Sequence, residues 1–260
     1  MTELNKGKCA VVIVAAGSGQ RLGHGVPKAR VALGGDPMLV HTVRGVVKSG
    51  VADQICIAIP PGDAELVEIC PDLVTNSGAH EGMLWNVVDG GEDRSASVRA
   101  ALAVIDPDVT TVLVHDAARP LTPSGVFARV TAALRDGAKA AIPALAVVDT
   151  IKEVVPTELP LTGAGVEKVS GTPPRSRLRA VQTPQGFDLE TLRRAHAYAE
   201  SLDPVQAAQI TDDAMLVEAL GEDVYVVQGS THSLKITSPT DLLLAEAMME
   251  GPLRPHWVEG

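Results

Sequence analysis

The composition of the chain is typical of a folded globular protein and excludes several classes. Of its 260 residues, 45% are hydrophobic and 21% are charged, which fits one large domain, or one with a small appendage. Acidic residues exceed basic ones by 32 − 22 = 10, so the surface as a whole repels phosphate polymers. Aromatic residues make up only 2%, too few for the stacking platforms of single-stranded nucleic-acid binders. We therefore expect no nucleic-acid partner.

The cysteines and the N-terminal segment indicate a cytoplasmic protein. Cys9, Cys56 and Cys70 lie in apolar or amphipathic stretches and form no C-x-x-C pair, a pattern that favours buried, reduced thiols over disulfides or a zinc site. The apolar run Cys9–Ala16 ends at a glycine turn and is too short for a signal peptide or a membrane span. We expect no membrane partner.

Short apolar runs alternate with helical patterns through the first half of the chain. This alternation predicts an α/β fold whose central sheet is mostly parallel, with its strands buried on both faces. The predicted strands are Cys9–Ala15, Gln54–Ile59, Trp85–Val88, Thr111–Val114 and Lys139–Val148.

Three helices are predicted between these strands. Asp36 and Pro37 suit the N-cap and first position of one helix, which ends before Gly50. Thr122 and Pro123 open another, which Gly137 closes. The inward face of the first helix comprises Leu39, Val40, Val43, Val46 and Val47. That of the second comprises Val126, Phe127, Val130 and Leu134. The third helix is predicted over Ser95–Ile105.

The segment from Thr150 to Gln185 has a different pattern. Prolines and glycines interrupt short alternating runs too often for a helix, so we predict an extended arm or hairpin. It is also too long for an ordinary loop of a compact domain, which suggests a dimer contact. We expect one domain over residues 8–250, with residues 150–185 inserted as a β-arm.

After the arm, the sequence predicts helices at Asp188–Glu200 and Thr211–Leu220, a strand at Asp223–Gln228, an extended piece at Leu234–Ile236 and a helix that starts at Ser238-Pro239.

A glycine-rich turn follows the first predicted strand. Its glycines at positions 17, 19 and 23 do not fit G-x-G-x-x-G, and G-x-x-x-x-G-K-[ST] is missing too. Backbone amides of such a turn can approach phosphate oxygens closely, although a plain tight turn is the alternative. Arg21 and Lys28 flank the turn, and an arginine fork with a lysine point charge suits a triphosphate. We favour phosphate binding.

A polar cluster follows the predicted strand at Thr111–Val114. Asp116 stands where a carboxylate can hold Mg²⁺ against nucleotide phosphates. In the alternative interpretation Asp116 caps a turn and Arg119 is its surface ion pair. His115 is interpreted as structural.

Two further segments are ambiguous by themselves. Gly90 and Gly91 join a strand to a helix that starts near Ser97, where backbone amides and hydroxyls can read a nucleobase edge or simply cap the helix. Lys235 and Thr237 precede the last helix, and Lys235 is either functional or a lysine whose stem lies on apolar neighbours.

Taken together, the motifs resemble one family, the 2-C-methyl-D-erythritol 4-phosphate cytidylyltransferases of the non-mevalonate isoprenoid pathway. They fall in family order and span about Val11 to Glu246. The matching segments are Ala15–Arg21 with Pro27-Lys28, Asp89–Gly91, His115–Pro120, Asp149–Lys152, Gln182–Phe187, Ile210–Asp213 and Lys235–Leu242.

The resemblance implies a Rossmann-like nucleotidyltransferase fold, a homodimer that exchanges β-arms, and transfer of CMP from CTP to 2-C-methyl-D-erythritol 4-phosphate with release of pyrophosphate. It also implies residue roles. Ala15, Ala16, Gly17, Ser18 and Gly19 would wrap CTP; Arg21 and Lys28 would stabilise charge on the triphosphate; Gly90, Gly91, Glu92 and Ser97 would recognise cytosine and ribose; Asp116 would contact ribose or Mg²⁺ and the substrate; Arg119, Lys235 and Thr237 would hold the methylerythritol phosphate; Thr150 and Arg175 would reach it in the partner subunit.

The chain departs from the family pattern in its arm. The stretch between Thr150 and Arg175 is longer than usual and rich in Pro and Gly. Arg175, Arg177 and Arg179 compete for the family's single phosphate-binding arginine, and we choose Arg175 because it lies ten residues before Gln185, a spacing that resembles that of the family. The chain also has extra residues, compared with the family pattern, around Asn76–Met83.

The implied chemistry needs no general base. A phosphate monoester has a second pKa of about 6 and is mostly a dianion at neutral pH, so it can attack the α-phosphorus of CTP directly. The enzyme must align two anions and neutralise charge, the task of Arg21, Lys28, Lys235 and Mg²⁺. Alternative functions are a ribitol-5-phosphate cytidylyltransferase, an inactive nucleotide-binding relative and an NAD-dependent dehydrogenase.

Overall fold

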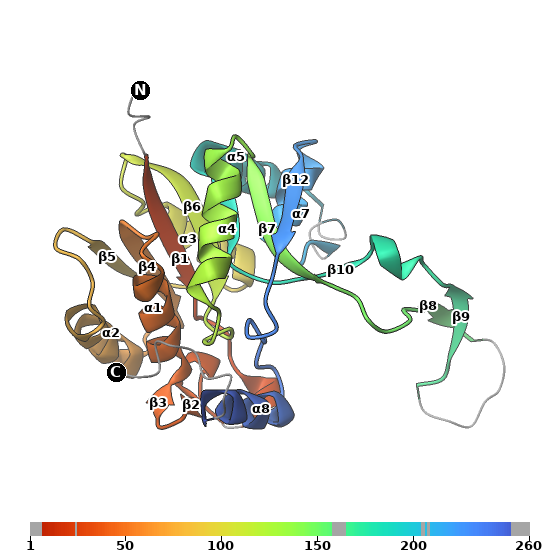
Figure 1. Cartoon of the computed structure of the whole chain (residues 1–260), viewed down its shortest axis with the longest axis horizontal. Helices are drawn as coiled ribbons and strands as arrows, with labels where there is room; N and C mark the ends of the chain where they lie inside the picture. Colours follow the sequence, from red (N-terminus) through yellow and green to blue (C-terminus); the bar gives the residue numbers. More distant parts are fainter. Residues whose placement is uncertain (1–6, 24, 158–164, 204–205, 207–208, 251–260) are drawn as a thin grey trace.

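The structure is a computed structural model in which a central β-sheet lies between two layers of helices (Figure 1). It describes residues 7–23, 25–157, 165–203, 206 and 209–250, without the side chains of residues 21, 71 and 74–76. One helix layer comprises α1 (Met38–Ser49), α2 (Ala64–Asn76) and α4 (Ser124–Arg135), and the other comprises α3 (Arg94–Leu102), α5 (Leu189–Ala199) and α7 (Asp213–Ala219).

The main sheet has the order β10-β7-β11-β6-β1-β4-β5, and β12 pairs with β7 as well. β1, β4, β5 and β6 are parallel to one another, while β11 is antiparallel to β6 and β7, and β10 is antiparallel to β7. The strands are β1 (Lys8–Val14), β4 (Gln54–Ile59), β5 (Leu84–Asp89), β6 (Val109–Asp116), β7 (Ala140–Ala146), β10 (Arg179–Val181), β11 (Gln185–Asp188) and β12 (Val224–Gln228).

Side chains of β1 show why this sheet is buried on both faces. Val11 and Ile13 pack with the α1, α2 and α4 layer, whereas Ala10 and Val12 pack with α3, α5 and α7. From β1 the chain continues through β4 to β5 on one side and later adds β6 on the other. The carboxyl ends of β1 and β6 therefore diverge at a topological switch point, where open α/β sheets bind ligands.

A smaller layer closes the body beside this edge. The short strands β2 (Ala32–Leu33) and β3 (Asp36–Pro37) pair with each other and lie close to α8 (Pro239–Glu250). Leu33 and Met38 pack there with Ile236 and Met249. The segment that carries Lys235 is held against the sheet in this way, because Ile236 N also donates to Ala118 O at 2.9 Å.

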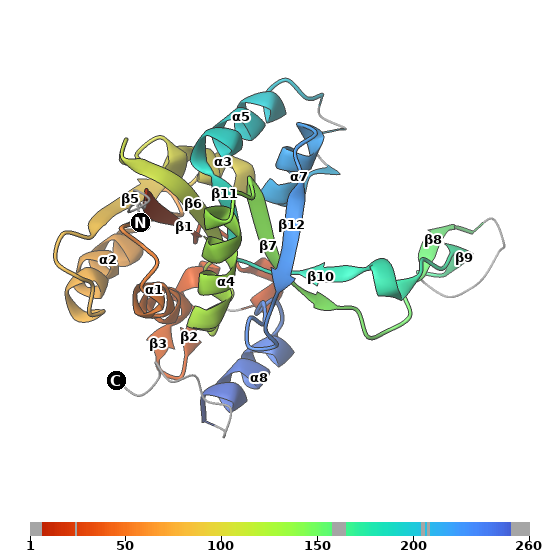
Figure 2. The ribbon, with the colours of Figure 1, turned by 45° about the horizontal axis from the view of Figure 1, so that its top comes forward.

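The breaker-rich segment forms a protruding arm. β8 (Glu153–Pro156) and β9 (Glu167–Gly171) pair antiparallel as a separate ribbon that stands away from the body in both Figures 1 and 2. β7 leads to it, and β10 returns antiparallel to β7 after the short 3-10 helix η3 (Arg175–Arg177). Residues 158–164 of the predicted arm lie outside the described residues.

Most predicted elements are present within about three residues of their predicted ends, but the first helix starts differently. Asp36 and Pro37 form β3, and α1 begins at Met38 with Pro37 as its N-cap. Pro37 has φ −54° and ψ 143°, an extended conformation outside the helix. Pro123 takes the same position before α4. Neither Asp36 nor Thr122 is therefore an N-cap, whereas Ser238 accepts the Asp241 N–H at 3.2 Å before Pro239, as predicted for α8.

Three parts of the fold differ from the sequence prediction. Helix α2 was not predicted because Pro71 interrupts its pattern, yet the Asp63 carboxylate accepts the Leu66 N–H at 3.1 Å as its N-cap. Strand β11 was not predicted either and lies between β6 and β7. The segment around Leu234–Ile236 pairs with no strand among the described residues.

Candidate active site

A cavity of about 660 Å³ opens at the carboxyl ends of β1 and β6, a volume within the usual range for small-molecule sites. Its wall combines the segment after β1, the start of α3, the segment after β6 and the segment before α8. The lining residues predicted from sequence are Ala15, Ala16, Gly17, Ser18, Gly19, Lys28, Gly91, Glu92, Ser97, Asp116, Lys235 and Thr237.

The glycine loop after β1 positions Lys28. The Lys28 N–H donates to Gly17 O at 3.0 Å, so the loop folds back on the short 3-10 helix η2 (Lys28–Arg30). Gly19 has φ +71°, and a Cβ there would lie 2.9 Å from Val26 O. Only glycine permits this turn and this approach. Arg21 lies in the 3-10 helix η1 (Gln20–Leu22), and its side chain is outside the described part of the structure.

The turn between β5 and α3 supports the glycine loop from the other side. A Cβ on Gly90 would lie 2.5 Å from the Ala16 Cβ, so Gly90 allows the two turns to touch and does not itself line the cavity. The Gly91 N–H donates to Ser97 Oγ at 3.1 Å, and this hydroxyl donates to Asp93 O at 2.9 Å. Ser97 therefore shapes the turn.

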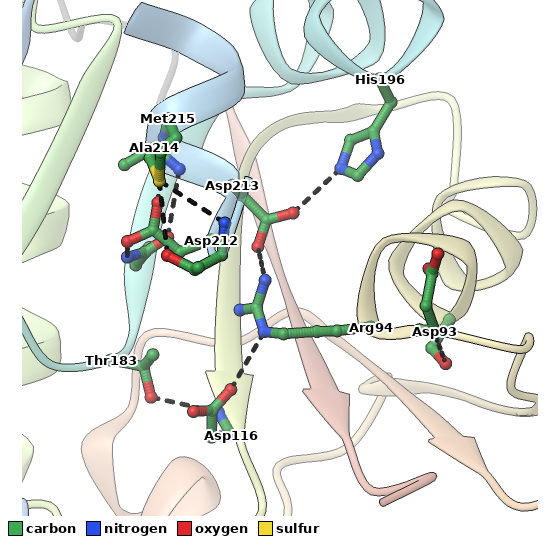
Figure 3. Close-up of polar contacts among 12 residues, drawn as sticks. Asp93, Arg94, Asp116, Thr183, His196, Asp212, Asp213, Ala214 and Met215 are labelled. Atoms are coloured by element: carbon green, nitrogen blue, oxygen red, sulfur yellow. Dashed lines mark hydrogen bonds and ion pairs between the residues drawn. The ribbon is translucent and has the colours of Figure 1, made fainter. Parts of the chain in front are cut away.

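Asp116, the last residue of β6, lies between two cations (Figure 3 shows its contact with Arg94). Its Oδ1 is 3.4 Å from Arg94 Nε, and its Oδ2 is 2.7 Å from Lys235 Nζ. Burial alone would raise the pKa of Asp116, but the charges of Arg94 and Lys235 outweigh it and hold that pKa well below its usual range. The carboxylate is ionised and joins two walls of the cavity.

His115 is structural, as predicted. It is fully buried, and burial lowers its pKa to about 4. The ring is therefore neutral at physiological pH, and its Nδ1 can accept from Thr183 Oγ1 at 2.9 Å. The same hydroxyl accepts the Asp116 N–H at 3.1 Å, so this contact anchors the backbone of the site.

Two predicted substrate ligands have other partners. Arg119 is buried, is not among the cavity-lining residues, and donates to Ser233 O at 2.6 Å and Val181 O at 3.4 Å. Thr237 lines the cavity, but its hydroxyl donates to the Asp241 carboxylate at 2.7 Å. Both contacts hold the segment before α8.

The predicted arm ligands are remote from this cavity. Thr150 and Arg175 are exposed and do not line it, and Arg175 Nη1 donates to Val148 O at 2.7 Å. In Figures 1 and 2 the arm points away from the body of its own chain.

Sequence reasoning gave Arg94, Asp213 and His196 no role, yet the structure joins them beside the cavity. Arg94 lines the cavity and pairs with Asp213 at 2.6 Å, and His196 Nε2 lies 3.0 Å from the second oxygen of Asp213 (Figure 3). Two sequence signals were available: Asp213 ends the family-like segment Ile210–Asp213, and Arg94 lies in the first turn of α3, where the helix dipole disfavours a cation.

The described residues do not form a resident metal site. Among them, no group of three or more His, Cys, Asp or Glu side chains is placed to hold an ion. Asp116 already faces two cations, which would repel a third. Mg²⁺ bound through Asp116 alone does not fit; an ion that arrives on a triphosphate would bring most of its oxygen ligands with it.

Comparisons with known proteins show the family of the chain. The sequence model of the 2-C-methyl-D-erythritol 4-phosphate cytidylyltransferase family matches residues 9–251. The chain belongs to this family of nucleotidyltransferases.

Similar proteins cover nearly the whole chain. The cytidylyltransferase of that name from Rhodococcus opacus is 48% identical over 245 residues, 94% of this chain and 96% of the relative. The one from Streptomyces avermitilis is 46% identical over 243 residues, 93% of this chain and 92% of the relative. The crystal structure of the enzyme of that name from Thermus thermophilus is 35% identical with a TM-score of 0.70, and covers 94% of this chain and 100% of that one.

Proposed function

We propose that this protein transfers CMP from CTP to 2-C-methyl-D-erythritol 4-phosphate, producing 4-diphosphocytidyl-2-C-methyl-D-erythritol and pyrophosphate. The observation that carries the proposal is the cavity in which a glycine loop, Lys28 and Lys235 converge in a chain of this family. Two lysines and backbone amides supply the positive environment that a triphosphate and a phosphate monoester require.

The nucleotide occupies the side of the cavity between the glycine loop and α3. Ala15, Ala16, Gly17, Ser18 and Gly19 surround the triphosphate, and Lys28 stabilises the negative charge that develops as pyrophosphate leaves. Gly91, Glu92 and Ser97 face cytosine and ribose, with Gly90 behind them. Arg21 starts from the same loop and acts with Lys28 in this proposal.

The acceptor phosphate lies near Lys235, which Asp116 holds at 2.7 Å. The dianion attacks the α-phosphorus in line with the departing pyrophosphate, and no side chain needs to remove a proton. Asp116 contributes by fixing the ammonium group and by offering an oxygen to hydroxyls of ribose or polyol. Thr237 and Arg119 shape the same wall, and a phosphate competes with their present partners.

Mg²⁺ enters as the magnesium complex of CTP, so it is part of the substrate. Triphosphate oxygens supply the hard ligands that this ion prefers. When bound, the ion neutralises part of the phosphate charge. The described residues then need only orient the complex, since no group of three or more ligating side chains among them is placed to hold an ion.

The active form in this proposal is a homodimer joined through the arms. Large apolar side chains are exposed on the arm and along its base: Val148, Ile151, Val154, Val155, Val166 and Val169. Such a concentration of exposed apolar surface is typical of an interaction site. Thr150 and Arg175 then reach the acceptor phosphate of the other subunit.

The expected compartment is the cytoplasm, where CTP is made. Cys9, Cys56 and Cys70 are free and buried, as predicted, and burial raises the pKa of each thiol. Within the described residues, none of the helices is both long and apolar enough to cross a bilayer.

The test is pyrophosphate release with CTP and Mg²⁺ in three parallel reactions. One contains methylerythritol phosphate, one ribitol 5-phosphate and one no acceptor. We expect turnover only in the first. Turnover only with ribitol 5-phosphate would preserve the nucleotide site and overturn the acceptor, and no release with either acceptor would contradict the proposal.

A further inference from the structure

Arg94 stands where local helix energetics disfavour it. It is the first residue of α3, directly after the N-cap Asp93, whose carboxylate accepts the Ala96 N–H at 2.7 Å. The first turn of a helix carries a partial positive charge, so an arginine there is unfavourable unless tertiary contacts compensate. The first turn of α3 contains no acidic residue, so the compensation comes from elsewhere in the chain.

The compensating group is Asp213, the first residue of α7. Its side chain is 0% exposed, and a buried carboxylate is costly unless it is paired and hydrogen-bonded. Arg94 Nη1 lies 2.6 Å from one of its oxygens, and His196 Nε2 lies 3.0 Å from the other. Burial alone would raise the pKa of Asp213, but the contacts with His196 and Arg94 lower it, so the carboxylate is ionised.

The guanidinium group reaches from this buried anchor to the cavity. Figure 3 shows Arg94 between Asp213 on α7 and Asp116 at the end of β6. Its Nη1 faces Asp213 and its Nε faces Asp116 Oδ1 at 3.4 Å, so one planar group spans two carboxylates. A lysine carries a single point charge and cannot span both.

The far oxygen of Asp116 is the one that holds Lys235. Lys235 is 41% exposed along its side chain, and its ammonium group is within 2.7 Å of Asp116 Oδ2. A long side chain with this exposure has many accessible rotamers. The orientation of the Asp116 carboxylate therefore decides where the charge of Lys235 stands in the cavity.

We propose that Arg94 is a positioning residue for the transfer reaction: anchored on Asp213, it orients Asp116, which in turn places Lys235 against the acceptor phosphate. This inference rests on the proposed function, because it assigns Lys235 a role there. Arg94 acts through Asp116 and needs no contact with the reacting atoms.

Two variants test the bridge that Arg94 forms between Asp213 and Asp116, without leaving a buried charge unpaired. The double variant R94Q/D213N removes the arginine together with the carboxylate that it neutralises. R94K retains a cation beside Asp213 but cannot span to Asp116. The matched control is R99Q, because Arg99 lies on the same helix, does not line the cavity, and pairs with Glu200 at 3.6 Å on the surface.

We expect kcat to fall about 10- to 100-fold in R94Q/D213N and in R94K, because small misplacements of a reacting group cost this much. The KM for CTP should change less than about threefold, since the glycine loop and Lys28 are unaffected. R99Q should keep kcat within about twofold. Circular dichroism and thermal melting establish that each variant is folded.

The titration of Asp116 itself provides a readout that a purely structural role would not move. The charged or titratable groups that face Asp116 are Arg94, Lys235, Arg119 and His115. Removing Arg94 takes away one of the cations that lower the pKa of Asp116, so this pKa rises. In a carboxylate ¹³C NMR titration the pKa of Asp116 should therefore be higher in R94Q/D213N than in the wild type and unchanged in R99Q.

Wild-type kcat in either Arg94 variant would overturn the inference, as would a loss of kcat that only matches a loss of folded protein. If the wild type releases no pyrophosphate with any acceptor, the proposed function fails. The positioning contact is then read by itself, by carboxylate ¹³C NMR titration of Asp116. A higher pKa in R94Q/D213N supports the bridge, and an unchanged one overturns it.

Discussion

The cavity edge of the sheet and the β8–β9 arm differ in how their side chains are covered and partnered. At the cavity, the charged groups Arg94, Asp116 and Asp213 are partnered within one chain, and Asp213 is wholly buried. On the arm, Val154 and Val169 are 45% and 52% exposed. Buried charge demands partners close by, whereas exposed apolar surface gains free energy only when something else covers it. The charges of the cavity are balanced within one chain, whereas the exposed valines of the arm would be covered only in the proposed dimer.

Because of this difference, substitutions in the two regions should affect different properties of the protein. A change at the cavity should affect the chemistry of each subunit. A change on the arm should affect association first and activity through it. Neutral positions exist elsewhere on the molecule, and they provide controls.

The largest expected effect is on the chemical step. In Lys28→Ala we expect kcat to fall about 10²- to 10³-fold, because a lost electrostatic stabiliser of the transition state costs this much. The affinity for CTP, measured by calorimetry, should fall far less. Lys8→Ala is the control, since Lys8 starts β1 at the end opposite the glycine loop and pairs with Asp108 at the surface. Full turnover in Lys28→Ala would remove Lys28 from the mechanism.

The next effect tests the arm. Val154 and Val169 are cross-strand partners, so the double variant V154E/V169E places two like charges opposite each other on an apolar surface. We expect it to sediment as a monomer at micromolar concentration where the wild type is a dimer. Its kcat/KM for the acceptor should fall about 10- to 100-fold, the value of a lost charged hydrogen bond.

Val67→Glu is the matched control for the arm, because Val67 is 50% exposed on α2. It should leave both the sedimentation and the activity unchanged. A wild type that is already monomeric, or an unchanged dimer in V154E/V169E, would contradict the arm-mediated dimer.

A smaller effect compares two glycines of the cavity. In Gly90→Ala the new Cβ meets Ala16 and Ser97 at 2.5 and 2.9 Å, and such overpacking costs about 1–3 kcal/mol. In Gly17→Ala no atom lies within 4 Å of the new Cβ, so the free protein should melt as before. That methyl group stands in the proposed nucleotide site, however, and should weaken the thermal shift caused by CTP. Equal melting temperatures for both variants without CTP would contradict this account.

The last prediction concerns the pH dependence of stability. Burial lowers the pKa of His115 from 6.5 to about 4. Between these pH values the unfolded chain binds a proton that the folded chain does not, so stability falls on acidification, by on the order of 3 kcal/mol. His115→Gln should have a flatter dependence of melting temperature on pH in this window. Equal slopes in the wild type and in His115→Gln would contradict the assignment.

Much of the nucleotide side of the site could be predicted from the sequence. The glycine turn, Lys28 and the Gly90-Gly91 turn all follow strands with strong apolar patterns, and parallel strands bring their carboxyl ends to one edge. Local sequence is sufficient where a motif acts through its own backbone. The same holds for the arm, because its prolines and glycines exclude a helix.

Other parts depended on long-range contacts. Arg119 and Thr237 were predicted as phosphate ligands, and the structure shows them paired with Ser233 and Asp241. Helix α2 forms in spite of Pro71 because Leu66, Cys70 and Leu73 pack into the core. In each case the contacts that decide the outcome depend on tertiary packing, which the local sequence pattern does not predict.

The sequence by itself determined the α/β alternation, the glycine loop, the family and the protruding arm, because each depends on local periodicity or on residues close together in the chain. Only the tertiary structure decided that Arg94 meets Asp213, 119 positions later, and that the same guanidinium group reaches Asp116. A buried charge is stable only beside its partner, and sequence spacing cannot show which distant residues share one desolvated site.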